Sequence, residues 1–364
     1  MAQRKNTMPY VRLGNSGLKV SKIILGCMSY GTPDWQGWVL QEEESIKHIK
    51  AAYDAGINTF DTANVYSNGL SEIFLGKAIK QHNLPREEIV VLTKVYFPVG
   101  HDLKTTMFDI TNPDQQGYVN QHGLSRKHIF DSVKKSLERL QLDYIDVLQC
   151  HRFDPDTPIE ETMQALHDVV KAGYVRYIGM SSCHAWQFSA MQNYAINNKL
   201  TPFISMQNHY NLIYREEERE MFPTLNWLAL AHPMVPTRTW RRLQATFCYN
   251  KRTETDEWTK GYPSSHLRHN KLSFGGLSVA MTPRSPTHYL CISVEEIAKS
   301  KGVSMAQVSL AWVMSKPGVT APIVGTTSLD NLKDLVGAVD IKLTTEEIAK
   351  LDEPYKAQAV FGHA

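Results

Sequence analysis

Short apolar runs alternate with segments of helical periodicity along most of the chain. Near the N-terminus a polar turn containing Gly14 and Gly17 separates two short extended runs, which predicts an opening β-hairpin. Further on, residues 126–140 carry apolar side chains every three or four positions, as an amphipathic helix does, and residues 144–150 are typical of a buried strand. Repeated pairs of strand and helix predict a parallel sheet covered by helices.

The alternation predicts eight strands and eight helices. Strands are expected at residues 22–26, 57–60, 88–93, 144–150, 175–180, 203–207 and 321–325, with one more near residue 228. Helices are expected at residues 42–56, 70–81, 126–140, 159–173, 185–197, 304–316 and 329–339, with a helix start at 215–220. An open dinucleotide-binding sheet carries G-x-G-x-x-G in its first strand–helix turn, and this chain has no such motif. We therefore predict an α/β fold, a closed (β/α)8 TIM barrel formed by residues 9–354 as a single domain.

The composition narrows the range of partners. The chain is 42% hydrophobic and 21% charged with a net charge of +2, which gives no basis for binding nucleic acid or a membrane surface. No apolar segment has the length of a signal peptide core or a bilayer span. The five cysteines form no CxxC pair and are odd in number, so we expect a reducing, cytoplasmic location.

Four ionisable side chains are expected together at one end of this barrel. In barrels of this type the reactive groups lie after the carboxyl ends of the strands. Asp61, Lys94 and His151 directly follow three of the predicted strands, and Tyr66 lies five residues beyond Asp61. The pattern therefore predicts that the four side chains converge on the barrel mouth. Any one of them alone is equally typical of a structural or solvated position.

These four residue types suit the reduction of a carbonyl group. Hydride transfer to the carbonyl carbon leaves negative charge on the oxygen, which a general acid must protonate. The pKa of tyrosine is about 10, and a neighbouring ammonium group lowers it by favouring the phenolate. We therefore expect Lys94 to lower the pKa of Tyr66, Asp61 to hold Lys94, and His151 to orient the carbonyl oxygen. The hydride requires a cofactor, because no side chain supplies one.

Other residues near the predicted mouth have simpler interpretations. Cys150 and Cys183 flank it, and small buried apolar side chains explain them better than a thiolate mechanism does. The histidines show no HxxH or HExxH spacing, so no metal site is expected. Trp35 and Trp38 suit either a substrate pocket or packing at the surface.

Several motifs together resemble the aldo-keto reductases, in particular their fungal aryl-alcohol-dehydrogenase-like branch. They are FDTANVYSNGLSEIFLGKAI, VVLTKV, DYIDVLQCHRFD, VRYIGMSS, SMQNHYNLIYREEE and APIVGTTSLDNLKDL, within residues 9–226 and 293–354. The resemblance implies an eight-stranded barrel that binds NADP(H) in an extended form and reduces small aldehydes or ketones. It implies that Tyr66 is the general acid and that Lys94, Asp61 and His151 are its catalytic partners.

The same resemblance implies two groups of cofactor-binding residues. Ser181, Ser182 and Gln207 match positions that hold the nicotinamide carboxamide, although Ser182 stands where many relatives carry asparagine. The segment GTTSLDNLKD matches the part that grips the adenosine phosphate, with contacts from Gly325, Thr326, Thr327, Ser328 and Asn331. Many relatives carry arginine at or near Asn331, so this chain departs from them in its phosphate contacts.

Residues 227–292 depart further from the family pattern. In the family the seventh strand and its loop are approximately IPWSPLARG, with the tryptophan on the nicotinamide and the loop amides on the pyrophosphate. No such motif occurs in this chain. We therefore expect the seventh strand and the loop after it to be disrupted or remodelled.

The codons of this stretch offer an explanation. A shift of one base converts Met234–Val235 into tryptophan and Trp240–Arg241 into glycine, at the spacing of the family motif. Our hypothesis is that residues from about 227 to 247 are out of frame relative to the ancestral gene. The alternative is a divergent loop insertion, and residues 263–291 suit a second shift or a retained intron. Sequencing the transcript tests the hypothesis, and relatives that share the stretch in frame would overturn it.

The altered seventh strand leaves two functions open. The four ionisable residues favour an enzyme, whereas a changed cofactor loop favours a non-catalytic cofactor-binding relative, like the potassium-channel β-subunits, or an inactive product. The long loop at residues 96–125 is expected to overhang the mouth. Its polar and aromatic composition suits an aromatic or aliphatic carbonyl substrate of modest size.

Overall fold

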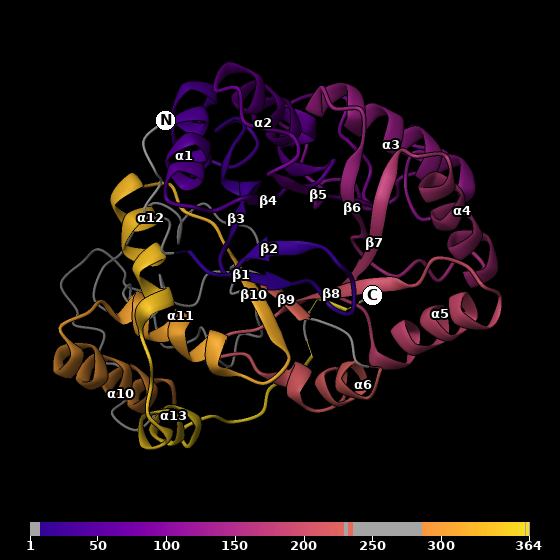
Figure 1. The fold of residues 1–364 in the computed structure, drawn as a ribbon. Coiled ribbons are helices and arrows are strands. Elements are labelled where there is room, and N and C mark those ends of the chain that lie inside the picture. Colours follow the sequence, from indigo (N-terminus) through magenta and orange to yellow (C-terminus); the bar gives the residue numbers. More distant parts are fainter. Residues whose placement is uncertain (1–7, 229–231, 236–285, 361, 364) are drawn as a thin grey trace, which may run out of the picture.

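Eight parallel strands close into a barrel at the centre of the molecule (Figure 1). The computed structural model describes residues 8–228, 232–235, 286–360 and 362–363. Neighbouring strands follow the order β10-β3-β4-β5-β6-β7-β8-β9, with β9 pairing back onto β10. The strands are β3 (Ile24–Gly26), β4 (Thr59–Asp61), β5 (Val90–Val95), β6 (Ile145–Cys150), β7 (Val175–Ser181), β8 (Phe203–His209), β9 (His232–Val235) and β10 (Val319–Val324). The predicted eight-stranded barrel is confirmed.

Helices surround the barrel and cover its outer face (Figure 1). They are α1 (Glu42–Asp54), α2 (Leu70–Gln81), α3 (Arg126–Leu140), α4 (Ile159–Lys171), α5 (Ala185–Asn197), α6 (Met221–Trp227), α10 (Pro286–Lys301), α11 (Met305–Ser315), α12 (Leu329–Val336) and α13 (Thr345–Asp352). Short 3₁₀ turns are η1 (Cys27–Ser29), η2 (Tyr66–Gly69), η3 (Glu216–Glu218) and η4 (Gly337–Asp340). Within the described part of the chain, no helix combines the length and apolarity needed to cross a membrane.

Helix α3 shows how the sequence defines these outer elements. Its boundaries coincide with the predicted residues 126–140. The hydroxyl of Ser125 accepts a hydrogen bond from the backbone N–H of His128 and so caps the first turn. Gln141 ends the helix in the left-handed conformation. Between these caps Ile129, Val133 and Leu140 are fully buried in the main core, where each such side chain contributes about 1.5–3 kcal/mol.

The N-terminal hairpin closes one end of the barrel. Strands β1 (Tyr10–Arg12) and β2 (Lys19–Ser21) pair antiparallel around the predicted turn. Leu13 and Val20 of this hairpin are fully buried and pack with Leu92, Val147 and other side chains that fill the lower barrel. The apolar plug leaves only the opposite end of the barrel for polar chemistry.

The seventh barrel strand is present in the structure. Strand β9 (His232–Val235) pairs parallel with β8 on one side and with β10 on the other, so the barrel has no open edge at this position. The strand expected near residue 228 is therefore confirmed four residues further on, and loss of the strand is excluded. The loop that follows it, with most of the stretch covered by the reading-frame hypothesis, lies outside the described residues.

Several elements differ from their predicted bounds. Strands β4, β5 and β7 extend one or two residues beyond the predicted ends, so that Asp61, Lys94 and Ser181 belong to strands rather than to loops. Helix α10 was not predicted, and its first residues, 286–291, show no helical pattern in the sequence. Helix α13 was not predicted either. It begins with a capping box in which Thr344 and Glu347 bond each other's backbone, a signal that the sequence does carry.

Candidate active site

A buried ion pair lies inside the barrel at its open end. The ammonium group of Lys94 on β5 is 2.6 Å from Oδ2 of Asp61 on β4 and donates a second hydrogen bond to the carbonyl oxygen of Thr62, at 2.8 Å. The Lys94 side chain is only 1% exposed. Burial lowers the pKa of Lys94, but Asp61 and Tyr66 together raise the pKa by more, so the amine stays protonated.

Two amide side chains hold the other carboxylate oxygen of Asp61. Gln149 on β6 donates to Oδ1 at 3.1 Å, and Gln207 on β8 donates to the same atom at 3.2 Å. Asp61 therefore has hydrogen bonds on both oxygens, as a buried carboxylate requires. Gln207, predicted as a nicotinamide contact, thus also belongs to the hydrogen-bond network of the ion pair. Gln149 was missed by the sequence analysis, although it lies two residues before His151 and on the same face of the strand.

Tyr66 lies beside this ion pair. Its hydroxyl accepts a hydrogen bond from the Lys94 ammonium group at 3.4 Å, and its ring packs edge-on against the ring of His151, with centroids 5.8 Å apart. The structure therefore brings Asp61, Lys94, Tyr66 and His151 together, as the sequence predicted. All four side chains are buried.

The expected lowering of the pKa of Tyr66 is wrong. Burial raises the pKa of Tyr66, Lys94 opposes this effect, and the charge of Asp61 adds to it, so the pKa stands above its ordinary value. Burial is the largest of these effects, and Lys94, which is 2.6 Å from Asp61 and 3.4 Å from the tyrosine hydroxyl, does not offset it. Tyr66 consequently keeps its proton at neutral pH.

His151 is neutral in this environment. Burial lowers the pKa of His151 far below its ordinary value, and the positive charges of Arg152 and Lys94 lower it further. The ring also packs edge-on against Phe97, at a centroid distance of 5.1 Å. A neutral imidazole carries one N–H, so it can donate a single hydrogen bond to a carbonyl oxygen.

The turn that carries Tyr66 has an unusual backbone. Ser67 and Asn68, directly after Tyr66, both have left-handed φ angles, 47° and 52°. Conformations of this kind cost about 1–2 kcal/mol per residue and need compensation. The side chain of Asn68 provides it, because it accepts from the N–H of Gly100 and donates to the carbonyl oxygens of Asp102 and Thr105. The turn is therefore fastened to the long loop at residues 96–125.

That loop packs over Tyr66. Phe97 and Met107 from the loop lie against a buried cluster formed by Tyr66, Trp35, Trp38 and neighbouring side chains. Of the two interpretations of the tryptophans, surface packing is excluded, because both are more than nine-tenths buried beside the tyrosine. Cys150 and Cys183 are buried free thiols, as predicted.

The predicted nicotinamide contacts lie on neighbouring strands. Ser181, the last residue of β7, pairs in register with Gln207 on β8. Ser182 follows with a left-handed φ of 43°, and its N–H donates to the carbonyl oxygen of Gln207 at 3.1 Å. The two serine hydroxyls are 3.3 Å apart. These polar groups surround the end of the barrel next to Asp61.

The predicted phosphate contacts lie at the start of α12, directly after β10. The Ser328 hydroxyl caps this helix by accepting from the N–H of Asn331, and Thr326 bonds the backbone of Ser328 through its own hydroxyl. A helix N-terminus is a position that suits a phosphate group, although the Thr326 hydroxyl and the N–H of Asn331 are both bonded to Ser328 in this structure. In the barrel this group and the predicted nicotinamide contacts lie on either side of β9.

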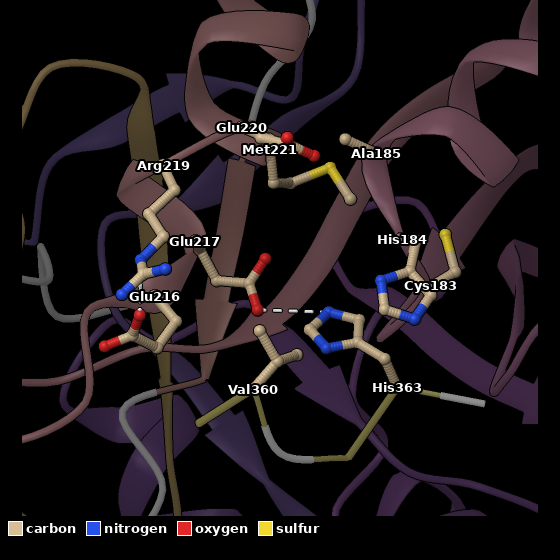
Figure 2. Close-up of a pocket in the computed structure, with 10 residues that line it drawn as sticks. All are labelled: Cys183, His184, Ala185, Glu216, Glu217, Arg219, Glu220, Met221, Val360 and His363. Carbon is tan, nitrogen blue, oxygen red and sulfur yellow. Dashed lines mark ion pairs between the residues drawn. The ribbon is translucent and has the colours of Figure 1, made fainter. Parts of the chain in front are cut away.

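A cavity of about 240 Å³ lies beside the mouth, between the start of α5 and the segment from η3 to α6 (Figure 2). The side chains of Glu217 and His363 meet at this cavity, with Oε1 of the glutamate 3.1 Å from Nε2 of the histidine. Cys183 and Met221 are among the other lining residues. No residue predicted for catalysis or cofactor binding lines this cavity, so it is separate from the candidate active site.

Comparison with known proteins identifies the class of protein that this barrel and site define. The sequence model of the aldo/keto reductase family matches residues 22–356, and the chain belongs to this family. It is an oxidoreductase of a family whose members act on carbonyl compounds with nicotinamide cofactors.

Relatives share nearly the whole chain. The versiconal hemiacetal acetate reductase of Aspergillus parasiticus is 48% identical and covers 97% of this chain and 98% of its own length. A protein of Schizosaccharomyces pombe that carries the name of an aryl-alcohol dehydrogenase is 46% identical over 95% of each chain. An aldo-keto reductase of Alternaria alternata is 44% identical over 98% of this chain and 94% of its own. The resemblance to the fungal aryl-alcohol-dehydrogenase-like branch is confirmed, and these matches run across the atypical residues 227–292.

The buried ion pair leads to a prediction about stability. Asp61→Asn is expected to lower the free energy of unfolding by about 3–5 kcal/mol, because Lys94 loses its counter-ion while remaining buried. The double variant Asp61→Asn/Lys94→Met removes both charges and is expected to recover part of this loss. Urea unfolding of the two single variants and the double variant measures the coupling. Strictly additive losses would show that the two charges do not stabilise each other.

Proposed function

We propose that this chain is an NADP(H)-dependent oxidoreductase that reduces aldehydes or ketones to alcohols, with Tyr66 as the general acid. The observation that carries the proposal is the contact of the Tyr66 hydroxyl with Lys94, which is itself bonded to Asp61. A protonated tyrosine beside a fixed buried cation is suited to deliver a proton to a developing alkoxide. Family membership supports the type of reaction.

Each side chain has a separate task in the proposed reaction. Reduced nicotinamide, when bound, supplies the hydride. Tyr66 donates its hydroxyl proton to the carbonyl oxygen as that oxygen becomes negative, and the O–H bond of the tyrosine breaks as the O–H bond of the alcohol forms. Lys94 faces the phenolate that remains, while Asp61 keeps the ammonium group in place. His151, neutral beside Tyr66, orients the carbonyl oxygen through its single N–H.

The cofactor assignment rests on two groups of residues. Ser181, Ser182 and Gln207 present hydroxyl and amide groups suited to a carboxamide, which both donates and accepts hydrogen bonds. Gly325, Thr326, Thr327, Ser328 and Asn331 surround the start of α12 and suit the adenosine phosphate. The family generally uses NAD(P)H, and we assign NADP(H) to this chain on the phosphate-binding character of that second group.

The proposed substrate is a small aromatic or aliphatic aldehyde or ketone. The buried aromatic and methionine side chains packed around Tyr66 favour an apolar substrate, and the names of the reductase and alcohol dehydrogenase relatives agree with a carbonyl–alcohol pair. We also propose that residues 9–354 form one domain and that the protein works in the cytoplasm without nucleic-acid or membrane partners.

The general acid is testable by removing one oxygen atom. Tyr66→Phe is expected to lower the rate of NADPH oxidation with a reactive aromatic aldehyde by about 10²–10⁴-fold, since the proton donor is lost. The affinity for NADPH, measured by fluorescence titration, is expected to stay nearly unchanged. Tyr53→Phe is the matched control, because it removes a hydroxyl that bonds Glu88 away from the site, and should keep full activity.

The outcomes of this assay separate the alternatives. Retention of most of the rate by Tyr66→Phe would show that the acid is another group. NADPH binding without turnover by the unaltered chain would indicate a non-catalytic cofactor-binding relative. Absence of binding would indicate an inactive product with a damaged cofactor loop.

The choice between NADPH and NADH is testable at Ser328. Ser328→Asp keeps an N-cap residue on α12 but adds a negative charge where the adenosine phosphate is proposed to bind. We expect the ratio of kcat/KM for NADPH to kcat/KM for NADH to fall about tenfold or more through like-charge repulsion. Ser328→Asn, a neutral cap of similar size, is the control and should keep the ratio. An equal loss with both nucleotides would contradict the assignment of a phosphate contact.

A further inference from the structure

A second buried cation lies next to the four ionisable residues. Arg152 directly follows His151 after the end of β6 and is 9% exposed. Its Nη1 donates a hydrogen bond of 2.6 Å to the backbone carbonyl oxygen of His151. Its guanidinium carbon is 5.5 Å from the ring centroid of Phe97. The sequence analysis missed this residue, although it is charged and stands at a strand end.

Arg152 is connected to the acid through a continuous set of rings. Phe97, under the guanidinium group, packs edge-on against His151, which in turn packs edge-on against Tyr66. Arg152, His151 and Tyr66 are each at most 9% exposed, so their surroundings are poorly solvated. Because charges interact more strongly in such a poorly solvated environment, the positive charge of Arg152 acts on both rings.

The charge balance of the site indicates what the positive charge of Arg152 can stabilise. The positive charge of Lys94 is opposed by the negative charge of Asp61 at 2.6 Å, so that pair contributes little net charge. Proton donation leaves a phenolate on Tyr66, and this negative charge is costly in a buried site. Burial lowers the pKa of Arg152 to about 10, so the guanidinium group still carries its charge at neutral pH.

We propose that Arg152 is a positioning residue for the reduction, holding the backbone of His151 and stabilising the phenolate of Tyr66 with its buried charge. The inference rests on the proposed function of Tyr66 as general acid. In the reduction the proton moves from Tyr66 to the carbonyl oxygen, and a proton from solvent later restores the tyrosine.

The charges around the two rings agree with this role. Burial has the largest effect on the pKa of Tyr66 and raises it. Lys94 lowers this pKa, Asp61 raises it, and Arg152 lowers it by the smallest of these effects. Arg152 also lowers the pKa of His151, in the same direction as burial and Lys94. Tyr96 and Cys183 are the other titratable groups that face Arg152, and both raise its pKa slightly against the effect of burial.

Two substitutions separate charge from hydrogen bonding. Arg152→Gln keeps an N–H donor for the His151 carbonyl group but removes the charge, whereas Arg152→Lys keeps the charge. Reduction requires protonated Tyr66, so activity falls as pH rises through the pKa of Tyr66. Without the cation the phenolate is less stable, and this basic limb of the kcat profile is expected to move to higher pH in Arg152→Gln. We expect kcat at neutral pH to fall about tenfold, which corresponds to a destabilisation of the phenolate form by about 1.4 kcal/mol.

Arg152→Lys is expected to keep the basic limb close to that of the unaltered chain. A purely structural role would give lower rates in both variants with no shift of the basic limb, and this result would overturn the proposal.

Tyrosinate absorbance provides a second readout, taken as the difference between each Arg152 variant and the same variant carrying Tyr66→Phe. If the unaltered chain shows no turnover, the proposed function fails. The absorbance titration then decides the role of Arg152 by itself, since an unchanged ionisation of Tyr66 in Arg152→Gln contradicts it.

Discussion

The buried ion pair between Lys94 and Asp61 is the interaction on which the rest of the site depends. Two opposite charges inside a barrel are tolerated only when they are close and their remaining hydrogen-bonding capacity is satisfied. Thr62, Gln149 and Gln207 satisfy it, and each comes from a different part of the barrel wall. The pair therefore requires a closed barrel, and the apolar plug formed by the hairpin at the other end leaves one location for it.

This pair also defines what Tyr66 can do. A lysine that is already neutralised by a carboxylate cannot overcome the burial of a tyrosine, and the tyrosine keeps its proton. A protonated hydroxyl is the form that a general acid needs. In the proposed reaction a phenolate remains on Tyr66 after the proton has left, and its negative charge would be costly in the same poorly solvated place. Arg152, which lies against Phe97 and His151, is placed to provide the stabilising charge that we propose for this phenolate.

The pattern of the chain was sufficient for most of the architecture and for the four central residues. Asp61, Lys94 and His151 could be found because polar residues that end buried apolar runs are exceptional, and parallel strands bring their carboxyl ends together. Trp35 and Trp38 could not be assigned, since an aromatic residue in a loop packs equally well at a surface. The pKa of Tyr66 was predicted in the wrong direction, although Asp61 was expected beside Lys94, because burial raises this pKa by more than Lys94 lowers it, and burial is defined only by the closed barrel. Strand β9 has four residues and no distinctive pattern, so a strand was expected only near residue 228, and its pairing with β8 and β10 placed it at residues 232–235.

The sequence alone determined the alternation of strands and helices, the absence of a dinucleotide-binding motif, and the identity of the ionisable groups, since these depend on local periodicity and residue type. Only the tertiary structure decided how those groups act on each other. The hydrogen bonds of Asn68 to the long loop and of the two amides to Asp61 join residues that lie far apart in the chain. Their effects depend on distances of about 3 Å and on burial, and neither quantity is defined before the barrel has closed.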